Sequence, residues 1–240
     1  MLLRLENSYN SMAASMRELE RIANNLANSN TVGYRKTRFF TEVLNEEIDA
    51  DGSPRSARSL QQWNDQSAAE LQRTDSALDV AIDGEGFFVI SDPETGETSY
   101  TRAGQFVLDN DSTIRTINGM LVEGTNGPID IPQETTTIDI RKNGEVLADG
   151  QPVGAIRVVQ FENPDNLTQF QDASFLPGDQ IPEDMEDPQL MQGHLEMSNV
   201  NVVNAMVELV QHSRLYEMQT KALRTTDLYL QRVGRDLSRF

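Results

Sequence analysis

The sequence contains no cysteine, only two histidines and only one tryptophan among its 240 residues. The lack of cysteine excludes a disulfide framework and thiolate chemistry. His194 and His212 have neither a cysteine nor another histidine at ligand spacing, so we expect no zinc or transition-metal site. The chain also lacks any run of about 18 apolar residues, so we predict no membrane-spanning helix and no direct membrane insertion.

The sequence motifs of common catalytic sites are missing as well. Gly84-Glu85-Gly86 lacks the third glycine of a dinucleotide-binding fingerprint, and no helical pattern follows it. Residues 109–113 begin like a calcium-binding EF-hand loop, but Ile114 stands where that loop needs glycine and Met120 where it needs glutamate. Neither a P-loop nor a Gly-x-Ser-x-Gly sequence occurs. We therefore predict that the chain is not an enzyme and binds no cofactor or metal.

Basic residues are scarce and unevenly placed. Residues 1–35 carry four basic and three acidic side chains, and residues 196–240 carry six and five. Residues 36–195 therefore hold 10 basic and 30 acidic side chains, a net charge of −20. Because nucleic acids and anionic lipids repel such a region, we expect neither as its partner.

The first 27 residues are predicted to form an amphipathic helix. No glycine or proline precedes Gly33, and Asn28, Asn30 and Gly33 tolerate left-handed backbone, so the helix is expected to end between Asn28 and Gly33. Gly33 most simply supplies a positive φ. Apolar side chains recur in alternating steps of four and three, which places them on one helical face. This first stripe consists of Leu5, Tyr9, Met12, Met16, Leu19, Ala23 and Leu26, widened by Ile22.

The start of the chain does not have the pattern of a cleaved signal peptide. Arg4 and Glu6 interrupt its apolar residues, and no small-residue cleavage site follows. We therefore expect any export to use another route.

A second helix is predicted from about residue 200 to the end, with Ser198 or Asn199 as its N-cap. Its stripe has the same alternating steps of four and three residues, and it consists of Val202, Met206, Leu209, Ser213, Tyr216, Thr220, Leu223, Asp227, Leu230, Gly234 and Leu237. Additional apolar side chains lie on neighbouring faces: Val203, Val207, Val210, Leu215, Met218 and Val233. A helix with apolar residues on more than one face is expected to have more than one partner.

The middle of the chain is predicted to be rich in β-strands. Residues 80–82 and 87–90 are strand-like, and Asn143-Gly144 predicts a hairpin with a type I′ turn. Phe87 and Phe88 should point to opposite faces of their sheet, one into the core and the other toward an interface. Residues 163–192, with four prolines and little periodicity, are expected to be a long loop or a loosely structured edge.

The predicted fold class is therefore α+β. We expect a terminal helical domain at 1–33 and 198–240, an extended connector at 34–77 and a β-rich domain at 78–197. Because a small β domain cannot cover both apolar stripes, the helices must pair with each other, with other subunits, or with both.

Three blocks of sequence resemble the flagellar rod and hook protein family. Residues 22–34 contain an Ala-Asn-Asn-Leu-Ala-Asn core that leads into Thr-Val-Gly-Tyr. Residues 78–89 (LDVAIDGEGFFV), continued by 100–106 (YTRAGQF), resemble the start of the family's β domain. Residues 193–201 (GHLEMSNVN) resemble the family's entry into its C-terminal helix. Within the family, the short connector and residues 205–207 and 216–221 resemble the proximal-rod (FlgF) type most and the distal-rod (FlgG) type next.

This resemblance implies a structural subunit of the flagellar basal-body rod. It implies a coiled-coil-like inner domain of terminal helices, self-assembly with other rod subunits, transmission of motor torque, and export to the periplasmic rod by the flagellar type III apparatus. The alternative is a secreted or soluble protein-binding domain outside any flagellum. The expected assembly interface consists of Leu5, Tyr9, Met12, Met16, Leu19, Ile22, Asn24, Asn25, Leu26, Asn28, Ser198, Asn199, Val202, Met206, Leu209, Tyr216, Leu223 and Leu230.

Overall fold

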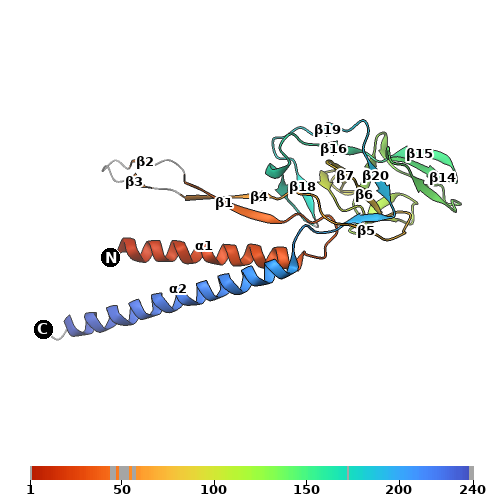
Figure 1. Cartoon of the computed structure of the whole chain (residues 1–240). Coiled ribbons are helices and arrows are strands. Elements are labelled where there is room, and N and C mark those ends of the chain that lie inside the picture. The colour runs from red at the N-terminus through yellow and green to blue at the C-terminus, as the bar shows by residue number, and fades with distance from the viewer. Residues whose placement is uncertain (1, 44–46, 49–53, 56–57, 172, 238–240) are drawn as a thin grey trace. The chain divides into compact units, whose positions relative to one another are not determined.

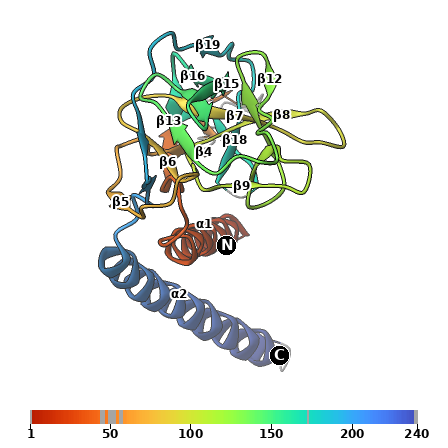
Figure 2. The same cartoon turned by 90° about the vertical axis from the view of Figure 1, so that its right-hand side faces the viewer.

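The chain folds into two compact units (Figures 1 and 2). The helical unit comprises Met1–Ala27 and Val200–Phe240, and the β unit comprises Asn28–Asn199. The computed structural model describes residues 2–43, 47–48, 54–55, 58–171 and 173–237, with side chains for 9–39, 62–171 and 173–225.

The helical unit consists of two helices, α1 (Leu2–Ala27) and α2 (Val202–Leu237). At 1.5 Å per residue they are about 39 Å and 54 Å long. They run antiparallel and contact each other, the end of α1 lying beside the start of α2 (Figure 1). α1 ends at Ala27, a turn follows, and Gly33 has φ +70°. The expected stop between Asn28 and Gly33 is therefore confirmed.

The start of α2 corrects the expected cap. The Asn201 side-chain oxygen accepts a hydrogen bond from the Asn204 backbone N–H at 3.0 Å, so Asn201 is the N-cap. Asn199 instead uses its amide group inside the β unit, where its oxygen accepts from the Lys36 N–H (2.6 Å) and its nitrogen donates to the Asp65 carbonyl (2.7 Å). These contacts prevent Asn199 from capping the helix.

The β unit is built from antiparallel strands (Figure 2). The strands are β1 (Thr37–Val43), β2 (Glu47–Ile48), β3 (Pro54–Arg55), β4 (Arg58–Asn64), β5 (Leu71–Arg73), β6 (Val80–Ile82), β7 (Phe87–Ser91), β8 (Thr98–Thr101), β9 (Phe106–Leu108), β10 (Ile114–Thr116), β11 (Leu121–Gly124), β12 (Gly127–Pro128), β13 (Ile138–Ile140), β14 (Glu145–Ala148), β15 (Gln151–Ala155), β16 (Val158–Gln160), β17 (Thr168–Gln169), β18 (Ser174–Leu176), β19 (Glu183–Asp184), β20 (Leu190–Gln192) and β21 (His194–Glu196). A short 3₁₀ helix spans Pro164–Asn166.

The main sheet has the strand order β17-β18-β8-β7-β11-β10-β9, with β16 also paired to β7. Strand β7 is buried along its whole length. Phe88 belongs to the larger core cluster, whereas Phe87 belongs to a second cluster and meets Phe161 and Phe175 edge to face at 5.7 Å. The two phenylalanines do point to opposite faces, but both faces are core. The expectation that one of them lies at an interface is wrong, because residues 158–176 cover the second face.

The Asn143-Gly144 hairpin forms between β13 and β14, as the sequence predicts. Gly144 has φ +87° and its N–H donates to the Arg141 carbonyl at 2.9 Å, while Asn143 does not have a positive φ. A type I′ turn needs positive φ at both central residues. The turn is therefore the longer kind, with glycine alone in the left-handed region.

Two stretches contain more regular structure than their sequence suggests. The expected connector, residues 34–77, includes a two-stranded ribbon in which Thr37–Val43 pairs with Arg58–Asn64 over seven residues. The expected loop at 163–192 includes β17–β20, of which β18 pairs with β8 and β20 with β6. These short strands find partners in the rest of the β unit, and local periodicity does not reveal such long-range pairing.

Candidate functional site

The chain segments that lead out of α1 and into α2 are joined inside the β unit. The Gly33 N–H donates to the Glu196 carbonyl at 2.8 Å, and the Asn199 N–H donates to the Tyr34 carbonyl at 3.4 Å. Strand β21 also pairs with β5. We call this region, residues 33–36 and 194–199 together with Arg102, the clasp. It joins the segment that follows the end of α1 to the segment that precedes the start of α2.

The centre of the clasp is a buried cluster of charges. Arg35 Nη2 lies 2.6 Å from Glu196 Oε1, and the two side chains are 0% and 4% exposed. Arg102 Nη1 lies 3.5 Å from Glu196 Oε2, and its guanidinium lies 5.1 Å from the Phe87 ring centroid. Burial lowers the pKa of Arg102 to about 10, although Glu196 acts in the opposite direction. One carboxylate thus compensates two buried guanidinium groups.

Gly33 allows the clasp to pack closely against the backbone that follows β8. A Cβ atom added at Gly33 would lie 2.3 Å from the Ala103 nitrogen and 2.5 Å from the Arg102 carbonyl carbon. Both are backbone atoms, so no side-chain rotation relieves the overlap. The position therefore needs glycine for two reasons, its positive φ and this close approach.

We expect Gly33→Ala to destabilise the β unit more than the backbone conformation alone explains. Gly96 is the matched control, because its φ is +71° but no atom lies within 4 Å of an added Cβ. Gly96→Ala should cost about 1–2 kcal/mol for left-handed backbone, and Gly33→Ala should cost more than that. Urea unfolding followed by the fluorescence of Trp63, the single tryptophan, measures both. Equal losses in the two variants would contradict the close approach.

One face of helix α2, called the inward face, is shielded from solvent. The residues of this face are separated by three or four positions, and they are buried or half-buried: Ala205, Leu209, His212, Tyr216, Gln219 and Leu223. At 100° per residue they span about 80°, a little less than a quarter of the helix circumference. Leu209, Tyr216 and Leu223 belong to the predicted stripe, whereas Met206 of that stripe is 51% exposed.

A second face of α2 is exposed and also largely apolar. Val203, Val207, Val210 and Met218 are 68%, 51%, 52% and 62% exposed. Arg214 and Lys221 are exposed at the same helical phase. We call these six residues, Val203, Val207, Val210, Arg214, Met218 and Lys221, the outer stripe. Because apolar side chains at helical spacing on an exposed face favour association, the outer stripe is a candidate surface for a second partner.

Helix α1 is buried most along one side of its predicted stripe. Ile22 is buried, and Met12, Leu19 and Leu26 are half-buried, whereas Tyr9 (71%) and Met16 (51%) are exposed. Of the predicted asparagines, Asn24 is exposed, Asn25 is buried, and Asn28 is half-buried and accepts a hydrogen bond from the Thr31 hydroxyl at 3.2 Å.

The remaining predicted interface residues lie in other places. Val202 opens α2 and is half-buried, and Ser198 and Asn199 belong to the clasp. The side chains of Leu5 and Leu230 lie outside the described residues. Sequence reasoning missed the charge cluster of Arg35, Arg102 and Glu196, although each of them lies in or next to a block that carries the family resemblance.

The described part of the chain contains no group of three or more acidic or histidine side chains placed to hold a metal ion. No helix in that part is long and apolar enough to cross a membrane.

Three stretches that together cover most of the chain match known protein families. Residues 5–35 match the family described as flagella basal body rod protein. Residues 81–148 match the D1 domain of the flagellar hook proteins FlgE/F/G, and residues 191–234 match the C-terminal region of the flagellar basal-body rod FlgEFG proteins. The three matches follow the three blocks found in the sequence.

Individual relatives match over nearly their full length. The flagellar basal-body rod protein FlgG of Caulobacter vibrioides is 35% identical, covering 95% of this chain and 96% of the relative. FlgG of Bacillus subtilis is 34% identical, covering 96% and 97%. The rod protein FlgF of Rhizobium meliloti is 31% identical, covering 90% of each chain. Relatives of both rod types are therefore similar to this chain.

Proposed function

The chain belongs to the family of flagellar basal-body rod proteins, and we propose that it assembles with other rod subunits through α1 and α2. As a member of this family it is a structural subunit of the basal body and not an enzyme. The observation that carries the proposal is the pair of apolar faces on α2, one turned inward and one exposed. An isolated two-helix unit needs only the first face, so the second is available for neighbouring subunits.

We propose that the terminal helices of many subunits form a coiled-coil-like inner layer. The alternating steps of three and four in both stripes support this arrangement. The interface predicted from the sequence, from Leu5 to Leu230, is proposed to lie in this layer. The exposure of Tyr9, Met16 and Met206 in the single chain agrees with a surface that becomes covered on assembly.

We propose that the rod transmits torque through the clasp. A rotating rod must pass force between the helical layer and the β unit of each subunit. The buried ion pair of Arg35 and Glu196 and the backbone hydrogen bonds around it hold the two connecting segments firmly. We further propose that the subunit reaches the periplasmic rod through the flagellar type III export apparatus, which the family resemblance implies.

An aspartate in the outer stripe tests assembly without disturbing the fold of the subunit. We expect Val207→Asp and Val210→Asp to reduce the amount of the chain in purified basal bodies at least tenfold, because each would bury an unpaired charge in the proposed interface. Both side chains are exposed in the single chain, so its circular dichroism and thermal unfolding should stay unchanged.

Asn204→Asp is the matched control for these variants. Asn204 is exposed in the first turn of α2, outside the outer stripe, where a negative charge favours the helix. It should support normal assembly. Normal incorporation of Val207→Asp and Val210→Asp would contradict the role of this face.

A further inference from the structure

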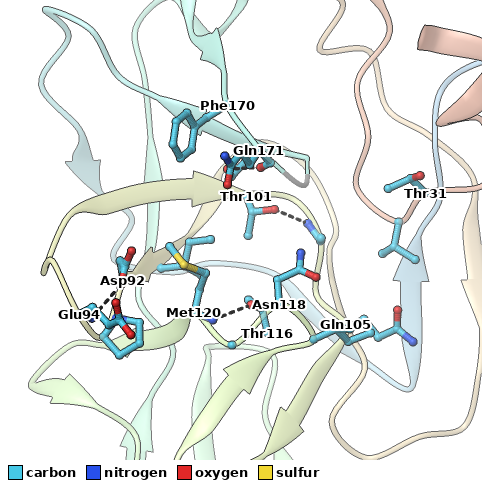
Figure 3. A pocket seen from close by; sticks show the side chains of 17 residues that line it. Thr31, Asp92, Glu94, Thr101, Gln105, Thr116, Asn118, Met120, Phe170 and Gln171 are labelled. Atoms are coloured by element: carbon cyan, nitrogen blue, oxygen red, sulfur yellow. Dashed lines mark hydrogen bonds between the residues drawn. The ribbon is translucent and has the colours of Figure 1, made fainter. Parts of the chain in front are cut away.

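A groove of about 650 Å³ opens on the surface of the β unit (Figure 3). Its walls come from the turns β7–β8, β10–β11 and β17–β18 and from residues 101–105 at the end of β8, and Thr31 lies at its margin, four residues after the end of α1. Figure 3 shows Asp92 and Glu94 on one side, Thr31 on the other and Met120 between them. The volume is within the range of pockets that take ligand-sized groups, about 300–1,000 Å³.

Hydrogen bonds hold two of these walls in place. In the β7–β8 turn, Asp92 accepts the Gly96 N–H through its carbonyl and the Glu94 N–H through its carboxylate, both at 2.8 Å. In the β10–β11 turn, the Gly119 N–H donates to the Thr116 carbonyl at 2.9 Å. A surface that is already ordered loses less entropy when a partner docks.

The groove combines exposed apolar side chains with negative charge. Ile117 and Phe170 line it, although they are 59% and 47% exposed to solvent. Asp92 and Glu94 line it as well, and no lysine or arginine of the described residues does. An occupant with apolar side chains and an adjacent positive charge would complement this surface.

The outer stripe of α2 has this complementary chemistry. It carries valine and methionine side chains together with Arg214 and Lys221, all exposed and at one helical phase. Glu217 borders the stripe, which itself bears two positive charges. A helix that lays an apolar face into a groove does so through anchors at i, i+4 and i+7. Val203, Val207 and Val210 have this spacing.

We propose that the groove of one rod subunit accepts the outer stripe of helix α2 from a neighbouring copy of the chain. The proposal rests on the function proposed above and names the surface that one subunit offers to the next. The contact joins two different surfaces, so it repeats from subunit to subunit along a helical assembly instead of closing a dimer. A few side chains of the stripe fill the groove, with Arg214 facing Glu94.

Photocrosslinking in assembled rods tests this contact. A photoreactive residue at position 117 should crosslink to residues 203–221 of a second copy, as peptide mass spectrometry identifies. Ile181 is the matched position, because it is apolar and 84% exposed but lies outside the groove. A photoreactive residue there should give less than one tenth of that product.

Reversing the charges of Glu94 and Arg214 tests whether these two side chains face each other. Glu94→Lys and Arg214→Glu should each lower the yield of the position-117 product several-fold, and the combination should restore it, because the pair is then oppositely charged again. Glu134→Lys, an exposed change outside the groove, should leave the yield unchanged.

The outcomes separate this inference from the proposed function. If the chain is present in purified basal bodies but position 117 crosslinks to another segment, to another protein or to nothing, the groove contact is wrong and the rod function stands. If the double charge exchange fails to restore the yield, the pairing with α2 is likewise wrong. Absence of the unmodified chain from basal bodies would overturn the proposed function, and this inference with it.

Discussion

Replacing Glu196 by glutamine is expected to destabilise the β unit by roughly 3–5 kcal/mol, the cost of leaving buried charges without their partner. The change keeps the shape of the side chain but removes the carboxylate that faces both guanidinium groups, so Arg35 and Arg102 stay buried without this partner. Urea unfolding followed by Trp63 fluorescence gives the loss as a lower midpoint at an unchanged slope.

The size of this effect depends on burial and not on distance. Arg157 and Asp184 also form an ion pair at 2.6 Å, but their side chains are 39% and 64% exposed. Asp184→Asn is therefore the matched control and should cost less than about 1 kcal/mol, because water and salt screen an exposed pair. Similar losses of stability for Glu196→Gln and Asp184→Asn would contradict the structure, in which Glu196 compensates the buried charges of the cluster.

A second comparison isolates the interaction within the cluster. Combining Glu196→Gln with Arg35→Met removes one of the two unpaired charges, so the double variant should be less destabilised than the sum of the single variants. Additive losses would mean that the two side chains contribute independently.

The sequence predicts those features of the fold that depend on neighbouring residues. Helix α1 ends where asparagines and Gly33 permit a left-handed turn, and the stripe residues of α2 are spaced by the helical period. The position of the Asn143-Gly144 hairpin is local as well. Its turn type is not, because one or two additional residues in the loop change which φ angles must be positive.

The features that the sequence does not predict depend on contacts between distant residues. Glu196 lies 161 positions from Arg35, and the register of β21 on β5 places it in the cluster. A charged residue in a short strand normally faces water, so no local pattern marks Glu196 as buried. The expectation that either Phe87 or Phe88 lies at an interface fails for a similar reason, because Phe87 too is buried. The side chains that bury Phe87 include some from residues 158–176, and the sequence predicts a loop for most of this stretch.

The sequence does not predict the groove either, because the groove also depends on contacts between distant residues. Most of its walls come from segments spread between residues 90 and 174, and no local pattern marks any of these segments as part of a pocket. Only the strand order of the main sheet brings Glu94, Ile117 and Phe170 to one place. The apolar stripes of the helices, in contrast, are visible in the sequence, and they therefore carry the assembly prediction.

Leu209→Asp is expected to abolish swimming and rod incorporation while the β unit stays folded. Leu209 is half-buried on the inward face of α2, and Leu19 is half-buried on α1. Aspartate at either position removes favourable burial of roughly 1.5–3 kcal/mol and adds the larger cost of an unpaired charge in an apolar contact. If these two faces pack together in the inner layer, each substitution alone should disrupt that layer.

Because the helices and the β unit are separate compact units, the effect of each substitution on the two units can be measured separately. Trp63 belongs to the β unit, so its fluorescence reports on that unit and should give the same unfolding midpoint in Leu19→Asp, Leu209→Asp and the unmodified chain. Arg17→Ala and Glu20→Ala, on the exposed side of α1, should swim normally, because exposed charges typically contribute less than about 1 kcal/mol. Normal swimming of both aspartate variants would exclude an inner layer built from these faces. Loss of the Trp63 transition would show instead that the helices and the β unit fold as one.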